Sequence, residues 1–282
     1  MTAPAGSGAP GAVGSLTRRA LAALVLMPVV LGALWLGNPV WTILIAIAAG
    51  AMGWEWRRLT SRGSMGAIGW AMVALVAVVV LLPLSGRLDL ALWLLAGGTL
   101  LLGLAAGMRE GASHAGWLAA GILYVALPAL SLAWLRDIPE AGLATLLWLL
   151  ILVWAIDTAA YAAGKLIGGP KLIPRISPNK TWAGLAGGAL GALVVGYVAA
   201  RWIGQASPWP LACLSFLLAF IEQAGDAFES AVKRHFGVKD SSGLIPGHGG
   251  MLDRVDGLVA VALAVAGFVL VTGVAPLASD WP

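Results

Sequence analysis

Residues 141–163 read AGLATLLWLLILVWAIDTAAYAA, a stretch with a single charged side chain, Asp157. A hydrocarbon core about 30 Å thick is crossed by roughly 20 apolar residues in an α-helix. The stretch therefore predicts a membrane-spanning helix. Comparable apolar segments occupy residues 20–36, 39–56, 66–84, 88–107, 115–135, 182–203, 208–229 and 257–276.

The composition of the whole chain indicates that lipid is its solvent. Of the 282 residues, 60% are hydrophobic and 11% are charged, and the mean hydropathy is +0.91. Soluble domains average about 45–50% apolar and about 25% charged residues. So few charges exclude a disordered chain, a disulfide scaffold and a soluble nucleic-acid-binding protein. We predict an all-α fold, a polytopic integral membrane helical bundle with about nine transmembrane helices and no nucleic acid partner.

The domain organisation follows from where polar residues are scarce. Residues 1–17 are mostly Gly, Ala, Pro and Ser, which predicts a disordered lead-in. Residues 18–282 hold no long polar insert, so we expect one integral membrane domain. Arg18 and Arg19 precede an apolar stretch as in a secretory signal. The stretch lacks an evident small-residue cleavage site and runs into the next apolar segment, so we expect a retained first helix.

The distribution of basic residues predicts the orientation. With a cytoplasmic N-terminus, the outer side holds only three of the 17 Lys and Arg residues: Arg87, Arg136 and Arg201. Cytoplasmic loops of membrane proteins carry an excess of Lys and Arg. We therefore predict a cytoplasmic N-terminus and an odd number of crossings.

Acidic residues concentrate in two regions, 157–181 and 222–256. These regions hold seven of the 13 acids: Asp157, Glu222, Asp226, Glu229, Asp240, Asp253 and Asp256. Acids elsewhere are interpreted as loop charges, and Glu55 as a charge that flanks a helix end.

The acids of the second region share a helix face. Glu222, Asp226 and Glu229 have helical spacing, so they form one polar stripe that continues to Lys233. Three carboxylates near the bilayer are costly unless they are paired, protonated or bound to a cation. A cation is the simplest account, and oxygen ligands without a cysteine cluster favour Mg²⁺ over zinc.

The loop that follows this helix, residues 237–256, is rich in glycine. Gly243, Gly247, Gly249 and Gly250 allow backbone N–H groups to converge on an anion. Basic residues surround it: Lys233, Arg234, Lys239 and Arg254. Carboxylates, basic residues and a glycine-rich loop together suit metal-assisted phosphoryl or nucleotidyl transfer.

The first region joins Asp157 to a basic, turn-rich segment, residues 171–182. Ser177 or Thr181, with Lys180, lies near a predicted helix N-terminus and could seat a phosphate. The alternative is a positive loop that contacts anionic lipid head groups. Both regions emerge on the same predicted membrane face, which favours one shared catalytic region within residues 157–256.

At these residues the chain resembles the phosphatidate cytidylyltransferase family, the CDP-diacylglycerol synthases. Its signature is matched, at the family's spacing, by Ser230, Lys233, Arg234, Lys239, Asp240, Pro246, His248, Gly249, Gly250, Asp253, Arg254 and Asp256. Ala183 and the additional acid Glu222 depart from the family pattern.

The resemblance implies the substrates CTP and phosphatidic acid and the products CDP-diacylglycerol and pyrophosphate. It also implies Mg²⁺, one ion or two, and suggests a homodimer in the cell's inner membrane with its active site facing the cytoplasm.

The same resemblance leads to hypotheses for individual residues. Metal ligands are expected at Asp226 and Asp253, with support from Asp256 and Glu229. Phosphate clamps are expected at Lys233, Arg234, Lys239 and Arg254, and Asp240 and His248 join the catalytic set. Substrate contacts are expected at Ser177, Lys180, Thr181, Ser230, Gly249 and Gly250.

Two other functions compete with this interpretation. Intramembrane carboxylates also mark ion-coupled transporters, but the polar residues here gather at one face, without paired broken helices. A CTP-dependent lipid kinase would use similar residues but would release CDP instead of pyrophosphate.

Overall fold

The computed structural model describes residues 12–245 and 249–278, with side chains from residue 24 onward. Its helices are α1 (Ala12–Leu36), α2 (Val40–Thr60), α3 (Gly66–Leu81), η1 (Leu82–Ser85), α4 (Leu88–Glu110), α5 (Ala112–Arg136), α6 (Gly142–Leu166), α7 (Trp182–Trp202), α8 (Trp209–His235) and α9 (Leu252–Thr272). Each predicted apolar segment overlaps one of the α-helices, so the all-α prediction is confirmed for the described residues.

Two short strands in the basic segment were not predicted. β1 (Lys171–Ile173) and β2 (Ser177–Thr181) form an antiparallel hairpin, with Lys171 opposite Thr181 and Ile173 opposite Ser177. The hairpin connects α6 to α7. Its sequence lacks the alternating apolar pattern by which strands are recognised.

Seven helices in the described part of the chain are long and apolar enough to cross a membrane. They are α4 to α9 and α3 together with η1. The chain is therefore a multi-pass membrane protein.

The first helix begins earlier than expected. The predicted lead-in covers residues 1–17, of which residues 1–11 lie outside the described part and residues 12–17 belong to α1. No proline follows Pro10 until Pro28, so nothing in the sequence between them prevents the helix from extending toward the N-terminus.

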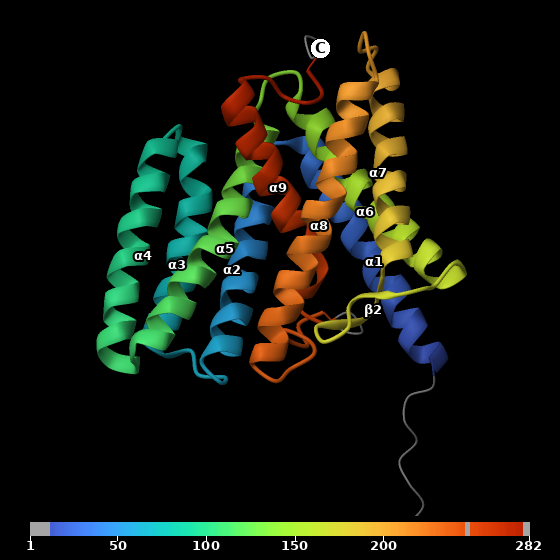
Figure 1. The fold of residues 1–282 in the computed structure, drawn as a ribbon. Coiled ribbons are helices and arrows are strands. Elements are labelled where there is room, and N and C mark those ends of the chain that lie inside the picture. The colour runs from blue at the N-terminus through green and yellow to red at the C-terminus, as the bar shows by residue number, and fades with distance from the viewer. Residues whose placement is uncertain (1–11, 246–248, 279–282) are drawn as a thin grey trace, which may run out of the picture.

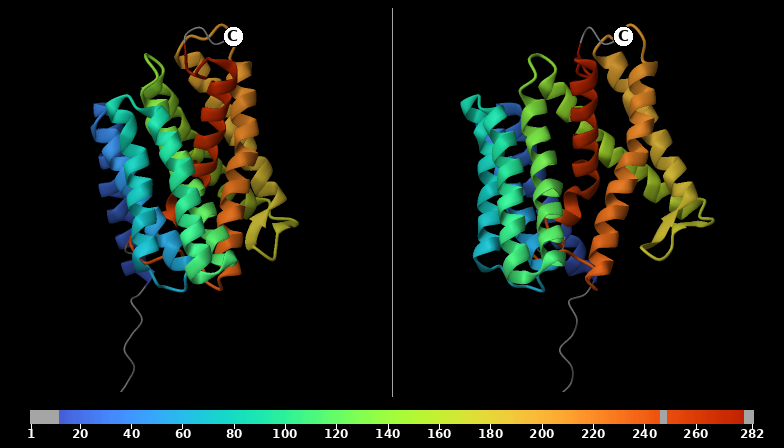
Figure 2. Two further views of the ribbon diagram at one scale, coloured as in Figure 1. Left: turned by 90° about the vertical axis from the view of Figure 1, so that its left-hand side faces the viewer. Right: turned by 60° about the vertical axis from the view of Figure 1, so that its left-hand side comes forward.

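The helices form two groups on either side of α9 (Figures 1 and 2). α2 to α5 lie on one side, and α6, α7 and α8 lie on the other. α9 contacts both α5 and α8. Its position in the middle brings the start of α9 next to the end of α8, at the lower end of the molecule in Figure 1.

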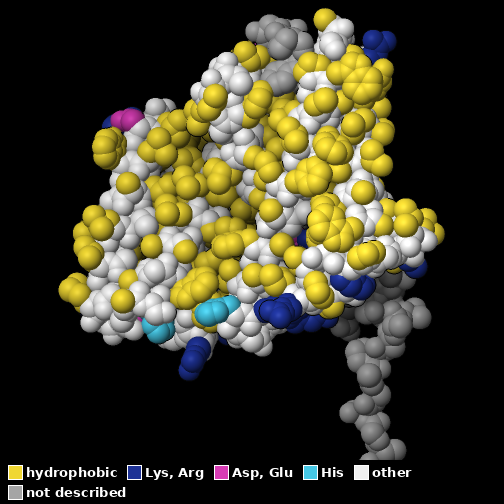
Figure 3. All heavy atoms as spheres, in the orientation of Figure 1, with side chains coloured by type: hydrophobic (Ala, Val, Ile, Leu, Met, Phe, Trp, Pro, Cys, Tyr) yellow, Lys and Arg dark blue, Asp and Glu magenta, His cyan; other side chains and the backbone are white. Residues whose placement is uncertain are grey.

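The outer surface matches a lipid environment. Figure 3 shows apolar side chains over most of the visible face, and Lys and Arg gathered along its lower edge. Trp93, Leu101 and Val271 are each at least two-thirds exposed. Such residues would be costly in water and are ordinary against acyl chains.

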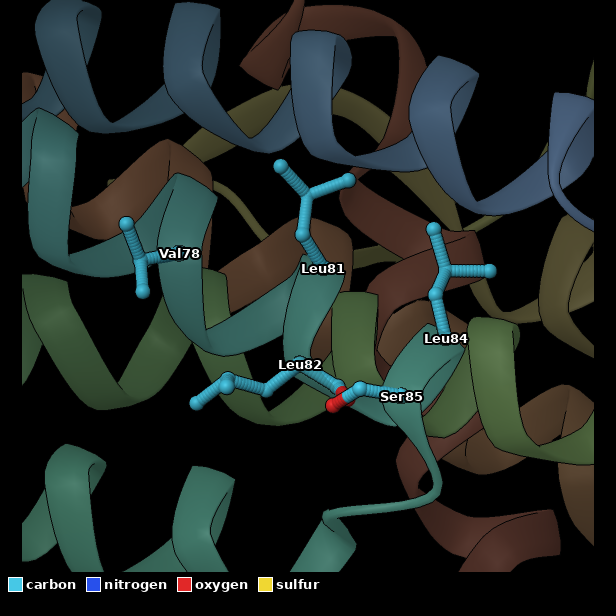
Figure 4. A pocket seen from close by; sticks show the side chains of 5 residues that line it. All are labelled: Val78, Leu81, Leu82, Leu84 and Ser85. Atoms are coloured by element: carbon cyan, nitrogen blue, oxygen red, sulfur yellow. The ribbon is translucent and has the colours of Figure 1, made fainter.

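One hollow in this surface, lined by Val78, Leu81, Leu82, Leu84 and Ser85, lies where α3 meets η1 (Figure 4). This hollow contains no charged side chain. It lies at the opposite end of the molecule from the acidic regions, so it is not the candidate site.

Small residues let α6 and α7 pack closely. A Cβ atom at Gly187 would overlap the Cβ of Ala163, and one at Gly191 would lie 2.8 Å from the Cβ of Ala159. Close approach through small residues is how membrane helices commonly associate. This contact holds the hairpin, which connects the two helices, in a fixed place.

We predict that Gly187→Ala destabilises the protein, because the added methyl group forces α6 and α7 apart. Overpacking of this kind costs about 1–3 kcal/mol. The measurement is thermal unfolding in detergent, where the variant should unfold at a lower temperature than the wild type. Gly103→Ala in α4 is the matched control, since no atom lies within 4 Å of its added methyl group. Equal unfolding temperatures for the two variants would contradict the prediction.

Candidate active site

The two acidic regions meet at the lower end of the bundle. Lys180 of β2 and Asp226 of α8 form an ion pair, with 2.6 Å between Nζ and Oδ2. The hydroxyl of Ser230 donates to the other oxygen of Asp226 at 3.2 Å. Asp157 of α6 has Asp226, Glu222, Lys180 and Arg254 as electrostatic neighbours. The hairpin, α6, α8 and α9 thus contribute to one cluster of charges.

Lys233 is the central cation of the cluster. Its Nζ lies 2.5 Å from Oε2 of Glu229, one turn earlier on α8, and 2.6 Å from Oδ1 of Asp253 on α9. Lys233 is 9% exposed and Glu229 is 2% exposed, so this is a buried arrangement. Two of the carboxylates predicted to bind metal therefore share a lysine ammonium in this structure.

Two buried polar groups near the cluster have atoms that are unpartnered within the described chain. Oε1 of Glu229 and the hydroxyl of Tyr124 on α5 are both buried and have no hydrogen-bond partner among the described residues. Glu229 acts electrostatically on Tyr124. Buried polar atoms are rarely left unsatisfied, so this space suits a polar ligand or water.

Asp253 organises the glycine-rich loop. Its Oδ2 accepts hydrogen bonds from the backbone N–H of Ser241 (2.9 Å), the Ser241 hydroxyl (3.0 Å) and the backbone N–H of Gly250 (2.8 Å). The prediction was that N–H groups of this loop face a phosphate. In the structure, the N–H of Gly250 faces a carboxylate of the protein instead.

Gly249 has a backbone requirement of its own. Its φ is +86°, a conformation that favours glycine, and a Cβ there would lie 2.8 Å from Oδ2 of Asp253. Glycine at this position is therefore needed for the loop to pass close to Asp253.

Glu55 belongs to this site, and its interpretation as a charge flanking a helix end is wrong. It is fully buried, and it accepts hydrogen bonds from the backbone N–H groups of Met251 and Leu252, both at 2.8 Å. The Ser242 hydroxyl donates to it at 2.6 Å. Its contacts are distant in the sequence, but one signal was available. Glu55 lies inside an apolar segment, where a lone acid indicates an internal partner.

The side chain of Thr181 has a structural role at the start of α7. Its side chain is buried and accepts a hydrogen bond from the backbone N–H of Gly184 at 3.0 Å, which caps the N-terminus of α7. Ser177 lies at the opposite end of β2, paired with Ile173. Of the predicted phosphate seat, only Lys180 contacts the acidic cluster among the described contacts.

The remaining predicted residues lie at the rim or outside the described residues. Exposed side chains belong to Arg234, Lys239, Asp240 and Arg254. Arg234 donates to the carbonyl of Val238 at 3.0 Å. His248 and Pro246 lie outside the described residues.

The carboxylates suit Mg²⁺ in chemistry but do not form a complete cage. No three acidic or histidine residues of the described chain are arranged to hold a metal ion by themselves. Mg²⁺ is usually bound by one or two carboxylates together with phosphate oxygens of the substrate. Asp226, Asp253 and Asp256 fit that second kind of site, since they come from adjoining helices.

A multi-pass helical protein with a cluster of carboxylates, lysines and a glycine-rich loop at one end fits the class of membrane enzymes that act on phosphates. A model of the Cytidylyltransferase family matches residues 17–272. Given this match over most of its length, the chain belongs to that family.

Curated relatives match most of the chain. A phosphatidate cytidylyltransferase of Brucella suis is 41% identical over 252 residues, which cover 88% of this chain and 91% of the relative. A phosphatidate cytidylyltransferase of Pseudomonas aeruginosa is 35% identical over 267 residues, which cover 92% of this chain and 98% of the relative. The family resemblance carried by residues 230–256 is confirmed.

We predict that Thr181→Ala lowers the unfolding temperature and that Thr181→Asn does not, because asparagine also caps helices. Loss of such a cap costs about 0.5–2 kcal/mol. Thermal unfolding of both variants in detergent is the measurement. If the alanine variant unfolds like the wild type but needs more CTP for half-maximal turnover, Thr181 binds substrate instead.

Proposed function

We propose that the protein transfers the cytidylyl group of CTP to phosphatidate, giving CDP-diacylglycerol and pyrophosphate. The observation that carries the proposal is the position of the family's motif. Its described charged residues gather where the hairpin, α8 and α9 meet. The chain also matches named phosphatidate cytidylyltransferases along most of its length.

The chemistry requires charge control more than proton transfer. A phosphate oxygen of phosphatidate attacks the α-phosphorus of CTP and forms a new P–O bond. The bond from that phosphorus to the oxygen bridging the β-phosphorus breaks, and pyrophosphate leaves with the electron pair. Because the nucleophile is already an anion, no strong general base is needed. The site must bring two polyanions together and stabilise charge on the leaving group.

Basic residues of the chain supply part of that stabilisation. Lys180 and Lys233 are held by carboxylates within the cluster. Their ammonium groups are therefore positioned before any substrate binds, which favours electrostatic stabilisation. The exposed residues Arg234, Lys239 and Arg254 lie at the rim, where we propose that they attract and clamp phosphate oxygens.

Mg²⁺ is the proposed cofactor, and when bound it neutralises phosphate charge. Asp226, Asp253 and Asp256 are the proposed ligands. Glu229 supports them by holding Lys233. A further substrate contact is proposed for Ser230, which donates to Asp226, and the roles of Ser177, Asp240, His248 and Gly249 remain proposals from the motif.

The distribution of basic residues supports an orientation of the protein in the membrane. We propose nine crossings, a cytoplasmic N-terminus and an active site at the cytoplasmic face of the inner membrane. The basic residues predicted to be outside, such as Arg87 and Arg201, lie at the end of the molecule opposite to the site (Figure 1). Acyl chains of phosphatidate would then stay in the bilayer while its phosphate reaches the cluster.

A homodimer is proposed from the family resemblance and is tested by measuring the mass of the detergent-purified protein.

The product formed from labelled CTP separates the proposal from the lipid kinase. With label on the α-phosphate, radioactivity should enter the lipid, and with label on the γ-phosphate it should leave as pyrophosphate. A γ-label on the lipid, with CDP as second product, would establish a kinase. Counterflow in liposomes without CTP would instead indicate a transporter.

We predict that Asp226→Asn and Asp253→Asn each lower turnover by orders of magnitude, because each removes a negative charge that holds a cation in the site. Metal-ion catalysis contributes several kcal/mol of charge stabilisation. Steady-state cytidylyl transfer by detergent-purified protein is the measurement. Asp89→Asn is the control, since Asp89 is exposed at the far end of α4. Near-normal turnover in both site variants would refute the metal assignment.

A further inference from the structure

Glu55 connects α2, in the N-terminal half of the molecule, to the glycine-rich loop. We propose that Glu55 is a positioning residue for cytidylyl transfer, which fixes Ser241, Ser242 and the start of α9 and, through them, Asp253 and Lys233. This inference rests on the proposed function. It assigns a role to a residue that lies well outside residues 157–256 and outside the family's motif.

The donors that contact Glu55 all come from one segment. They are the N–H groups of Met251 and Leu252 and the hydroxyl groups of Ser241 and Ser242, at 2.6–3.2 Å. Both oxygens of the carboxylate accept hydrogen bonds. Three donors, with the Ser241 hydroxyl as a fourth that Glu55 shares with Asp253, therefore tie the described parts of the loop to Glu55.

Glu55 also acts as the cap of α9. The residue at the N-cap position, Met251, makes no side-chain capping hydrogen bond. The first N–H groups of a helix need acceptors, and negative charge is stabilising there. A side chain from α2 therefore accepts from the first N–H groups of α9, while Asp253, the acid of the first turn of α9, accepts from Ser241 and Gly250.

Ser241 links Glu55 to the charged cluster. Its hydroxyl lies 3.2 Å from Oε2 of Glu55 and 3.0 Å from Oδ2 of Asp253. A hydroxyl group carries one proton, so it donates to one carboxylate at a time and lies between the two. Asp253 in turn binds Lys233. Loss of Glu55 would thus change the surroundings of a lysine with which it has no direct contact among the described interactions.

The glycine at position 250 fits this arrangement. A Cβ there would overlap the Ser241 hydroxyl and would lie 2.6 Å from Oε1 of Glu55. The space above Gly250 is already filled by Glu55 and Ser241. This motif glycine is therefore needed for the approach of Glu55, independently of any contact with phosphate.

Glu55→Gln is the first test. The amide has one acceptor oxygen, and its NH₂ group would face donors of the loop, so the isosteric change still breaks hydrogen bonds. We expect kcat to fall by roughly 10- to 100-fold, the effect of a small misplacement in a catalytic site, with little change in KM for phosphatidate. Deuterium exchange should rise in residues 241–245 and 249–252 and not in the helices that do not contact Glu55.

Three further variants separate positioning from stability. Glu110→Gln is the matched control, because it removes the partner of Arg57, another buried charge near the end of α2. It should lower the unfolding temperature without lowering kcat. Ser242→Ala removes one hydrogen bond to Glu55, and with it the bond that the Ser242 hydroxyl accepts from the N–H of Leu244. It keeps the buried carboxylate, so it should show a smaller loss of kcat in a protein that folds. Glu55→Asp, which keeps the charge, should recover part of the activity lost in Glu55→Gln.

The results can overturn the inference in two ways. It is wrong if Glu55→Gln keeps the wild-type kcat, or if exchange rises equally throughout the helices, which would indicate general destabilisation. A failure of the proposed function is distinct from both, because wild-type protein would then form no CDP-diacylglycerol. The exchange measurement would still decide whether Glu55 holds the loop.

Discussion

A carboxylate buried among membrane helices must find its hydrogen bonds inside the protein, because lipid offers none. Much of the local structure at the site depends on this constraint. Glu55 takes its hydrogen bonds from the start of α9, Asp253 from the loop before it, and Glu229 shares Lys233 with Asp253. Gly249 and Gly250 leave space for these contacts. The loop therefore takes its form from acids that surround it, and substrate phosphates meet a framework that is already charged and already hydrogen-bonded.

The same constraint explains why the site lies where the helices end. Backbone N–H groups without helical partners occur only at N-termini and in loops, so acids that need donors gather there. α9 begins in the middle of the bundle, between α5 and α8. Near its first turn, Ser241 of the loop contacts both Glu55 and Asp253. Lys233 of α8 contacts both Asp253 and Glu229. The tight contact of α6 with α7 then places the hairpin, and with it Lys180, beside Asp226.

Sequence alone predicted the helices of the described residues and singled out charged residues that the structure brings together. Apolar runs define the nine α-helices of the described residues because lipid demands length and composition together, and scarce charges drew attention to Asp226, Lys233 and Asp253. The hairpin was missed because strands of three and five residues in a polar segment carry no periodic signal. The role of Glu55 was missed because its partners lie up to 197 positions away, a distance over which spacing conveys nothing. Thr181 was predicted to bind phosphate because a helix N-terminus attracts phosphate. The structure shows that its side chain caps α7, and phosphate binding by Thr181 stays a prediction.

The contact between Glu55 and α9 also has a consequence for how the protein is made. Ribosomes synthesise α2 long before α9, so the Glu55 carboxylate enters the membrane region without the donors that later surround it. It lies near the end of α2, where water can still reach it until the bundle closes. The final hydrogen bonds form only when the last helix is inserted. A truncated or stalled chain that lacks α9 would therefore keep an unsatisfied acid at the membrane surface, and the charged cluster would assemble last in biogenesis.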